Sequence, residues 1–171
     1  ISGRGVSELR IAVSGMGARN AEREFRRALN SEEGLPDWIL TCGFAGGLNL
    51  ELAAGEVIFE ADAGAWFADR LCRAGGRPGV FYCADRVATT VGEKSELRRR
   101  TGADAVEMES GIIRELARER GVPSATVRVI SDAADAPLPL DFNSLMTPEM
   151  KLSGVGLAWR LLREPAKIPE L

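Results

Sequence analysis

Short apolar runs alternate along the chain with segments whose apolar residues recur at helical spacing. The runs are rich in β-branched and aromatic residues and are bounded by Gly, Pro or Asp, which is typical of buried strands. They predict strands at residues 8–14, 37–42, 55–60, 79–83 and 124–130, with helices around residues 21–29, 65–74, 93–100, 112–117 and 148–162. This alternation indicates an α/β fold, a three-layer αβα sandwich with a central mixed, mostly parallel sheet. The length fits a single domain, residues 1–171.

Glycine, serine and acidic residues collect where the predicted strands end. In open α/β sheets, ligands bind at the carboxyl ends of the strands. Four segments are therefore expected to line a site: residues 14–17 (SGMG), 43–47 (GFAGG), 108–110 (MES) and 131–135 (SDAAD). Gly15 lies in a predicted tight turn into a helix and Gly46 in a predicted glycine-rich loop, and both segments could bring backbone groups close to a ligand. Turns that require a positive φ would explain these glycines equally well.

The charge pattern limits the partners. The net charge is −3 and no basic block occurs, so the chain lacks the electrostatic footprint of a nucleic-acid or membrane-surface protein. Its apolar runs are far shorter than the roughly 20 residues that span a bilayer. We therefore expect a small-molecule ligand, with no nucleic acid and no membrane.

The chain contains no histidine, and this limits the chemistry. Ser-His-Asp and Cys-His mechanisms are excluded, as are the zinc and iron sites that need histidine. Acid–base work must therefore fall to carboxylates. The spacing of Cys42, Cys72 and Cys83 matches neither a metal knuckle nor a redox pair, which predicts reduced thiols in a cytoplasmic protein without a metal.

Asp132 is the first candidate for acid catalysis. It follows a predicted buried strand and precedes Ala133 and Ala134, and in such a place burial raises the pKa of a carboxyl group. A protonated carboxyl group could act as a general acid. An Asp that follows Ser also commonly caps a turn, and the spacing alone leaves both explanations open. Asp135 is expected to be such a cap.

Glu109 is the second candidate, because it opens a predicted helix whose dipole favours the ionised carboxylate. An ionised carboxylate only accepts hydrogen bonds, which suits the two hydroxyls of a ribose. A glutamate that merely complements the helix dipole is the alternative. Glu107 points to the same side of the strand if the strand extends that far, and two acids on one side require a ligand or a cation.

Taken together, these segments resemble the purine nucleoside phosphorylase and nucleosidase superfamily. That superfamily includes methylthioadenosine/S-adenosylhomocysteine nucleosidases and hopanoid-associated phosphorylase-like proteins. The similar segments occur in the family's order: SGMG at 14–17, CGFAGGL at 42–48 followed by GEV at 55–57, AVEMES at 105–110, and VRVISDAAD at 127–135. The resemblance covers roughly residues 9–142, and its last two segments are the specific ones.

The resemblance implies an enzyme that cleaves the N-glycosidic bond of a purine nucleoside, as a nucleosidase or a phosphorylase. Asp132 would protonate or hydrogen-bond N7 of the leaving purine, and Glu109 would hold the ribose hydroxyls. The other residues expected at the substrate are Met108, Glu107, Ser131, Val87, Ala88, Gly46 and Gly15. No cofactor and no metal are implied, although phosphate is possible as a co-substrate.

Two departures from the family pattern leave the co-substrate open. Family members usually begin with a further strand, which in nucleosidases brings the glutamate that activates water; this sequence starts after that point, so we expect a domain without that first strand. Thr41, Cys42 and Phe44 surround the glycine segment, where phosphorylases carry Ser or Thr and a nearby Arg for phosphate. Arg19 or Arg128 could serve an anion instead.

Other interpretations remain beside the enzyme. One is a catalytically impaired relative that holds a nucleoside or nucleobase without cleaving it, and another is a phosphorylase-like enzyme of hopanoid metabolism. The resemblance also implies a homo-oligomer. Trp66 and Phe67 could belong to its interface, or to a helix face packed on the sheet of the same chain.

Overall fold

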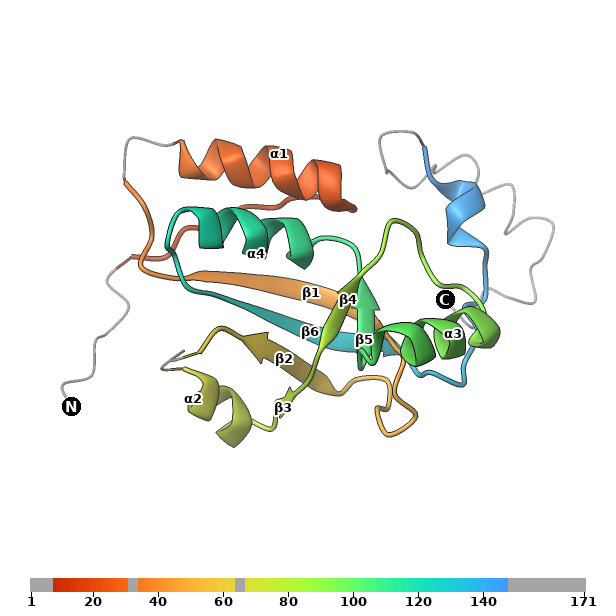
Figure 1. Ribbon diagram of the computed structural model, residues 1–171. Helices are drawn as coiled ribbons and strands as arrows, with labels where there is room; N and C mark the ends of the chain where they lie inside the picture. The colour runs from red at the N-terminus through yellow and green to blue at the C-terminus, as the bar shows by residue number, and fades with distance from the viewer. Residues whose placement is uncertain (1–7, 31–33, 64–66, 148–171) are drawn as a thin grey trace.

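The structure, a computed structural model, describes residues 8–30, 34–63 and 67–147. Its strands form one six-stranded sheet in the order β3-β2-β6-β1-β5-β4 (Figure 1). Their bounds are β1 Ile39–Gly47, β2 Val57–Ala61, β3 Arg77–Pro78, β4 Phe81–Cys83, β5 Ala105–Glu107 and β6 Ser124–Asp132. The pairs β1–β6, β2–β3 and β4–β5 are parallel, whereas β1–β5 and β2–β6 are antiparallel. The predicted α/β class and the mixed sheet are confirmed.

Four α-helices occur in the part of the chain that the structure describes: α1 Ala18–Leu29, α2 Ala68–Arg73, α3 Val91–Thr101 and α4 Ser110–Glu119. A short 3-10 helix, η1 Phe142–Leu145, follows the sheet. Helices α1 and α4 lie together beside β1 and β6 (Figure 1). The core between them contains Ala21, Ile39, Ile113, Ala117 and Val122. Gly121 follows α4 with a φ of 67°, the left-handed conformation that glycine commonly adopts after the end of a helix.

Residues 8–14, predicted as the first strand, pair with no strand of the described sheet. The side chains that should alternate into a core, Leu9, Ile11 and Val13, are 75%, 82% and 86% exposed. The local pattern favours a strand, but a strand also needs a neighbour for its backbone groups. The edge of β1 opposite β6 has no strand partner over most of its length, since β1 pairs with β5 only at Gly46 and Gly47.

The glycine segment 43–47, predicted as a loop after the strand, is instead the second half of β1 and pairs with β6. Neither Gly46 nor Gly47 has a positive φ. A Cβ atom on Gly46 would lie 3.3 Å from Oδ2 of Asp132, and one on Gly47 would lie 3.0 Å from the Asp132 carbonyl oxygen. These glycines therefore let β1 approach Asp132 closely, which is a different reason for glycine from a turn that requires a positive φ.

Some predictions fall at or beyond the edges of the described residues. The helix predicted at 148–162 and Trp66 lie outside them. The ring of Phe67 packs edge-on against Trp38, with 5.1 Å between the ring centroids, so Phe67 takes part in packing within the chain. Within residues 8–30, 34–63 and 67–147, no helix has the length and apolar character that crossing a membrane requires.

Candidate active site

A cavity of about 1080 Å³ lies where β1, β5 and β6 end. All nine residues that the sequence placed at the substrate line it: Gly15, Gly46, Val87, Ala88, Glu107, Met108, Glu109, Ser131 and Asp132. The cavity is also lined by Leu40, Cys42 and Phe44 of β1 and by Ala12 and Val13 of the segment before α1. The fold thus brings together residues that are far apart in the sequence, while their roles stay predictions.

Asp132 stands at the end of β6 and is held by two side chains. The Oγ hydroxyl of Ser131 donates to Oδ1 of Asp132, and the ammonium of Lys94 donates to Oδ2. Ser131 also donates to the carbonyl oxygen of Ala45 on the neighbouring strand. The carboxylate is therefore fixed in place, with 14% of the side chain exposed.

Lys94 was missed at the sequence level, because a lysine in a segment as rich in charge as residues 93–100 is ordinarily exposed. Its side chain is 0% exposed, and it is the buried residue of that helix. The ammonium forms an ion pair with Asp132 and donates to the carbonyl oxygens of Ala133, at 2.8 Å, and Ala136, at 2.7 Å. One clue was available: Lys94 is one of only three lysines among the 22 cationic residues of the chain.

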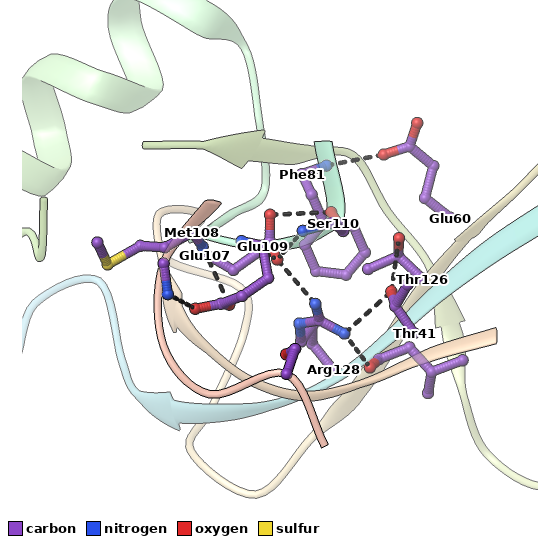
Figure 2. A network of polar contacts seen from close by, with 12 residues as sticks. Thr41, Glu60, Phe81, Glu107, Met108, Glu109, Ser110, Thr126 and Arg128 are labelled. Atoms are coloured by element: carbon purple, nitrogen blue, oxygen red, sulfur yellow. Dashed lines mark hydrogen bonds and ion pairs between the residues drawn. The ribbon is translucent and has the colours of Figure 1, made fainter. Parts of the chain in front are cut away.

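A buried ion pair neutralises Glu107, one of the two neighbouring acids Glu107 and Glu109 (Figure 2). Arg128 donates from Nη2 to Oε2 of Glu107 at 2.7 Å, and the two side chains are 3% and 0% exposed. Glu107 accepts three further hydrogen bonds, from the backbone N–H of Glu109 and from the backbone N–H and hydroxyl of Ser110. The required cation is thus Arg128, and Glu107 holds the start of α4.

Glu109 has different partners from Glu107. The backbone N–H of Gly17, at the start of α1, donates to its Oε1 at 2.7 Å. Burial raises the pKa of the Glu109 carboxyl group above its ordinary value, and the Gly17 hydrogen bond opposes this shift. The sequence predicted that the helix dipole would favour the ionised form, so burial outweighs that effect. This hydrogen bond also uses a backbone N–H of the 14–17 segment that was expected to face a ligand.

Arg128 has one nitrogen without a partner. Its Nη1 donates to Oγ1 of Thr41 at 3.2 Å and to the carbonyl oxygen of Val127 at 3.0 Å, whereas Nε is buried and unpaired. A buried donor without a partner is costly, and a ligand or a water molecule usually satisfies it. Arg128 and Thr41 line the cavity, but Nε itself is sealed from solvent beside Gly43 of β1.

The segment expected to contact the base is held by Asn143, which the sequence analysis did not identify. The side-chain amide of Asn143 accepts from the backbone N–H of Val87 at 3.0 Å and donates to its carbonyl oxygen at 2.9 Å. Both backbone groups of Val87 are therefore in use. Next to it, Ala88 is buried, and Phe142 and Met146 add further apolar wall to this part of the cavity.

Comparison with known families agrees with this geometry. The sequence profile of the Phosphorylase superfamily matches residues 68–162. These residues include α3, β5, α4 and β6, and they make up more than half of the chain. The chain therefore belongs to the phosphorylase superfamily. A search of curated protein sequences gave no match.

Solved structures share this fold. The futalosine hydrolase of Helicobacter pylori strain 26695 superposes with a TM-score of 0.61 at 20% identity, over 71% of this chain and 65% of that chain. The 5′-methylthioadenosine/S-adenosylhomocysteine nucleosidase of Campylobacter jejuni gives 0.63 at 20% identity, over 77% and 70%. The corresponding nucleosidase of Neisseria meningitidis gives 0.61 at 23%, over 72% and 67%. The present chain thus spans about two thirds of the length of these proteins.

Proposed function

We propose that this protein cleaves the N-glycosidic bond of a purine nucleoside. The observation that supports this most directly is the position of two acids, since Asp132 and Glu109 line the same cavity. Membership of the phosphorylase superfamily supports it as well, and so do the hydrolase and nucleosidases that share the fold.

Asp132 acts as the general acid in this proposal. When the bond between ribose and base breaks, the electron pair stays on the base, and a proton from the Asp132 carboxyl group neutralises it. General acid catalysis of this kind is worth roughly 10²- to 10⁴-fold in rate. The hydroxyl of Ser131 and the ammonium of Lys94 hold Asp132 as a carboxylate before the reaction, so Asp132 first takes up a proton from solvent and then passes it to the leaving base.

Glu109 binds the ribose hydroxyls, and Met108 packs beside the sugar. A carboxylate that accepts one hydrogen bond from Gly17 retains lone pairs for two hydroxyl groups. Glu107 is placed next to Glu109 but is occupied by Arg128 and α4, so it supports the site rather than binding the sugar. The base then lies against the apolar wall at Ala88 and Phe142.

Water is the proposed acceptor of the ribosyl group. Among the described residues that line the cavity, the cationic side chains are Arg86 and Arg128. Each is in an ion pair, Arg86 with Glu93 and Arg128 with Glu107. A phosphate dianion would therefore meet no unpaired cation there, whereas a neutral water molecule needs none. After its oxygen bonds to the ribosyl carbon, the water releases one proton to solvent.

The test is base release by Asp132→Asn, with adenosine, methylthioadenosine, S-adenosylhomocysteine and inosine as substrates, each with and without phosphate. We expect the variant to lose roughly 10²- to 10⁴-fold in kcat on the active substrate. Asp69→Asn is the matched control, because Asp69 lies in the first turn of α2, is exposed and does not line the cavity. Unchanged turnover by Asp132→Asn would refute the role of Asp132. A requirement for phosphate would refute hydrolysis, and recovery of intact nucleoside after binding would favour a binding protein.

A further inference from the structure

Lys94 makes an unusual set of contacts for a lysine. Removing an ammonium group from water costs several kcal/mol unless its hydrogen bonds are replaced. Here all three donors of the ammonium are used, by the Asp132 carboxylate and the carbonyl oxygens of Ala133 and Ala136. All three acceptors lie within residues 132–136, at the end of β6 and just after it, so a single ammonium group holds this stretch together.

That stretch forms part of the cavity wall. Asp132, Ala133 and Ala136 line the cavity, and Lys94 itself does not. Residues 133–136 follow the end of β6, so the sheet does not hold them. Lys94 reaches them from α3, whose position is fixed by a capping box between Thr90 and Glu93. The lysine thus connects the capped start of α3 to Asp132, at the end of β6, and to the loop that follows it.

The two oxygens of Asp132 are held from different sides. Ser131 donates to Oδ1 and Lys94 to Oδ2, while Gly46 leaves space for the carboxylate beside β1. Without Lys94, one oxygen would lose its partner, and the side chain could rotate toward solvent at the open cavity. The ammonium also places a positive charge next to the acid, where it stabilises the negative charge that develops on Asp132 as its proton passes to the departing base.

We propose that Lys94 is a positioning residue for the proposed reaction: it aims Asp132 at the leaving base and holds residues 133–136 as the wall beside it. This inference rests on the proposed function, because it takes Asp132 to be the group that faces the base. Lys94 contacts no substrate in this account. Its effect on the reaction passes through Asp132.

A double-mutant cycle tests whether the effect passes through Asp132. We expect Lys94→Met to lower kcat roughly 10- to 100-fold with little change in KM, because a hydrogen bond to a charged group and its alignment are lost. In the Asp132→Asn background, Lys94→Met should have almost no further effect on kcat. A residue that merely stabilises the fold would instead lower the activity of both backgrounds by the same factor.

Arg98→Met is the matched control on the same helix. Arg98 pairs with Asp104 and does not line the cavity, so its loss should leave kcat unchanged. If Lys94→Met does not fold, Lys94→Gln takes its place, and the double variant should fold because it removes both partners of the buried pair. Equal losses of kcat in the two backgrounds, or no loss in Lys94→Met, would overturn the positioning role.

The failure of this inference and that of the proposed function give different results. If Asp132→Asn alone keeps its turnover, the proposed function fails. If Asp132→Asn is impaired but Lys94→Met is not, the positioning role alone fails. A crystal structure of Lys94→Met gives a measure that does not depend on activity. We expect Asp132 and residues 133–136 to have moved, and unchanged positions would overturn the inference.

Discussion

The two ends of the cavity hold a carboxylate in different ways. At one end, Asp132 pairs directly with the buried Lys94. At the other end, the buried Arg128 pairs with Glu107, and Glu109 receives only backbone N–H groups. Lys94 therefore fixes the proposed acid itself. Arg128 fixes only Glu107, which is a neighbour of the residue proposed to bind the sugar, Glu109.

This difference corresponds to what each carboxylate is proposed to do. An acid that transfers a proton must hold one orientation. The ion pair with Lys94 provides it, because the ammonium is itself fixed by hydrogen bonds to the carbonyl oxygens of Ala133 and Ala136. A carboxylate that binds two hydroxyls must keep lone pairs free, and Glu109 keeps them because Arg128 contacts Glu107 instead. Removing either cation should therefore have different consequences, and the following predictions test this.

Arg128→Met should have the largest effect on stability. It would leave the fully buried Glu107 carboxylate without its cation, and breaking a buried pair in this way costs about 3–5 kcal/mol in the free energy of unfolding. Denaturant unfolding of the variant measures this loss. Arg118→Met, at an exposed position in the last turn of α4, is the control and should change stability by less than about 1 kcal/mol. Equal losses in the two variants would contradict the structural role of Arg128.

Glu109→Gln should weaken substrate binding while leaving stability almost unchanged. A neutral amide replaces a carboxylate that accepts from ribose, so we expect KM to rise by about 10- to 100-fold, as hydrogen bonds to charged groups are worth roughly 1.5–3 kcal/mol. Glu107→Gln should do the reverse, lowering the free energy of unfolding more than it raises KM, because Glu107 is held by Arg128 and α4. Steady-state kinetics and denaturant unfolding of both variants check this. If Glu107→Gln proved the weaker binder and Glu109→Gln the less stable protein, the assignment would be reversed.

Substrate binding should also depend on pH through Glu109. Because burial raises the pKa of Glu109, its charge is lost at a higher pH than the ordinary value of about 4.3 would give. As pH falls through the raised pKa, KM should rise, and the rise should vanish in Glu109→Gln. The sign for stability is opposite: a carboxyl group with a raised pKa in the folded state gains stability as pH falls toward its unfolded pKa. Kinetics and unfolding measured across the same pH range would reveal the two opposite trends.

The smallest effect is expected at Glu93, next to Lys94 on α3. Its carboxylate accepts from the backbone N–H groups of Thr89 and Thr90, and these bonds together with Arg86 lower its pKa to about 2. Glu93→Ala should reduce the free energy of unfolding by about 0.5–2 kcal/mol at neutral pH, since it breaks the capping box. This contribution is present above the ordinary pKa and is lost as pH falls toward about 2.

The control for Glu93 lies on the same helix. Glu96→Ala removes an exposed pair with Arg99 and should have a smaller effect on thermal unfolding. Because the capping box fixes the start of α3, Glu93→Ala should also lower kcat slightly by loosening Lys94, and should not alter KM. A change in KM without a change in kcat would mean that α3 serves the Glu109 end of the cavity instead.

Much of the fold could be predicted from local pattern. Runs of β-branched residues identified β1, β2, β4 and β6, and the spacing of Ile113, Leu116 and Ala117 identified α4. The strand predicted at residues 8–14 was wrong, because a strand also depends on a partner that a local pattern does not specify. The glycines of β1 were assigned to a loop, because the sequence does not show that Asp132 lies against them.

The sequence by itself determined most of the helices and strands, the exclusion of histidine chemistry, and two acidic segments that end at the same edge of the sheet. Tertiary structure alone decided which cation each acid meets. Lys94 and Asp132 are 38 residues apart, and Arg128 and Glu107 are 21 apart. The physical reason is that the energy of a charge depends on its burial and on the groups that surround it in space. Neighbours along the chain do not reveal either.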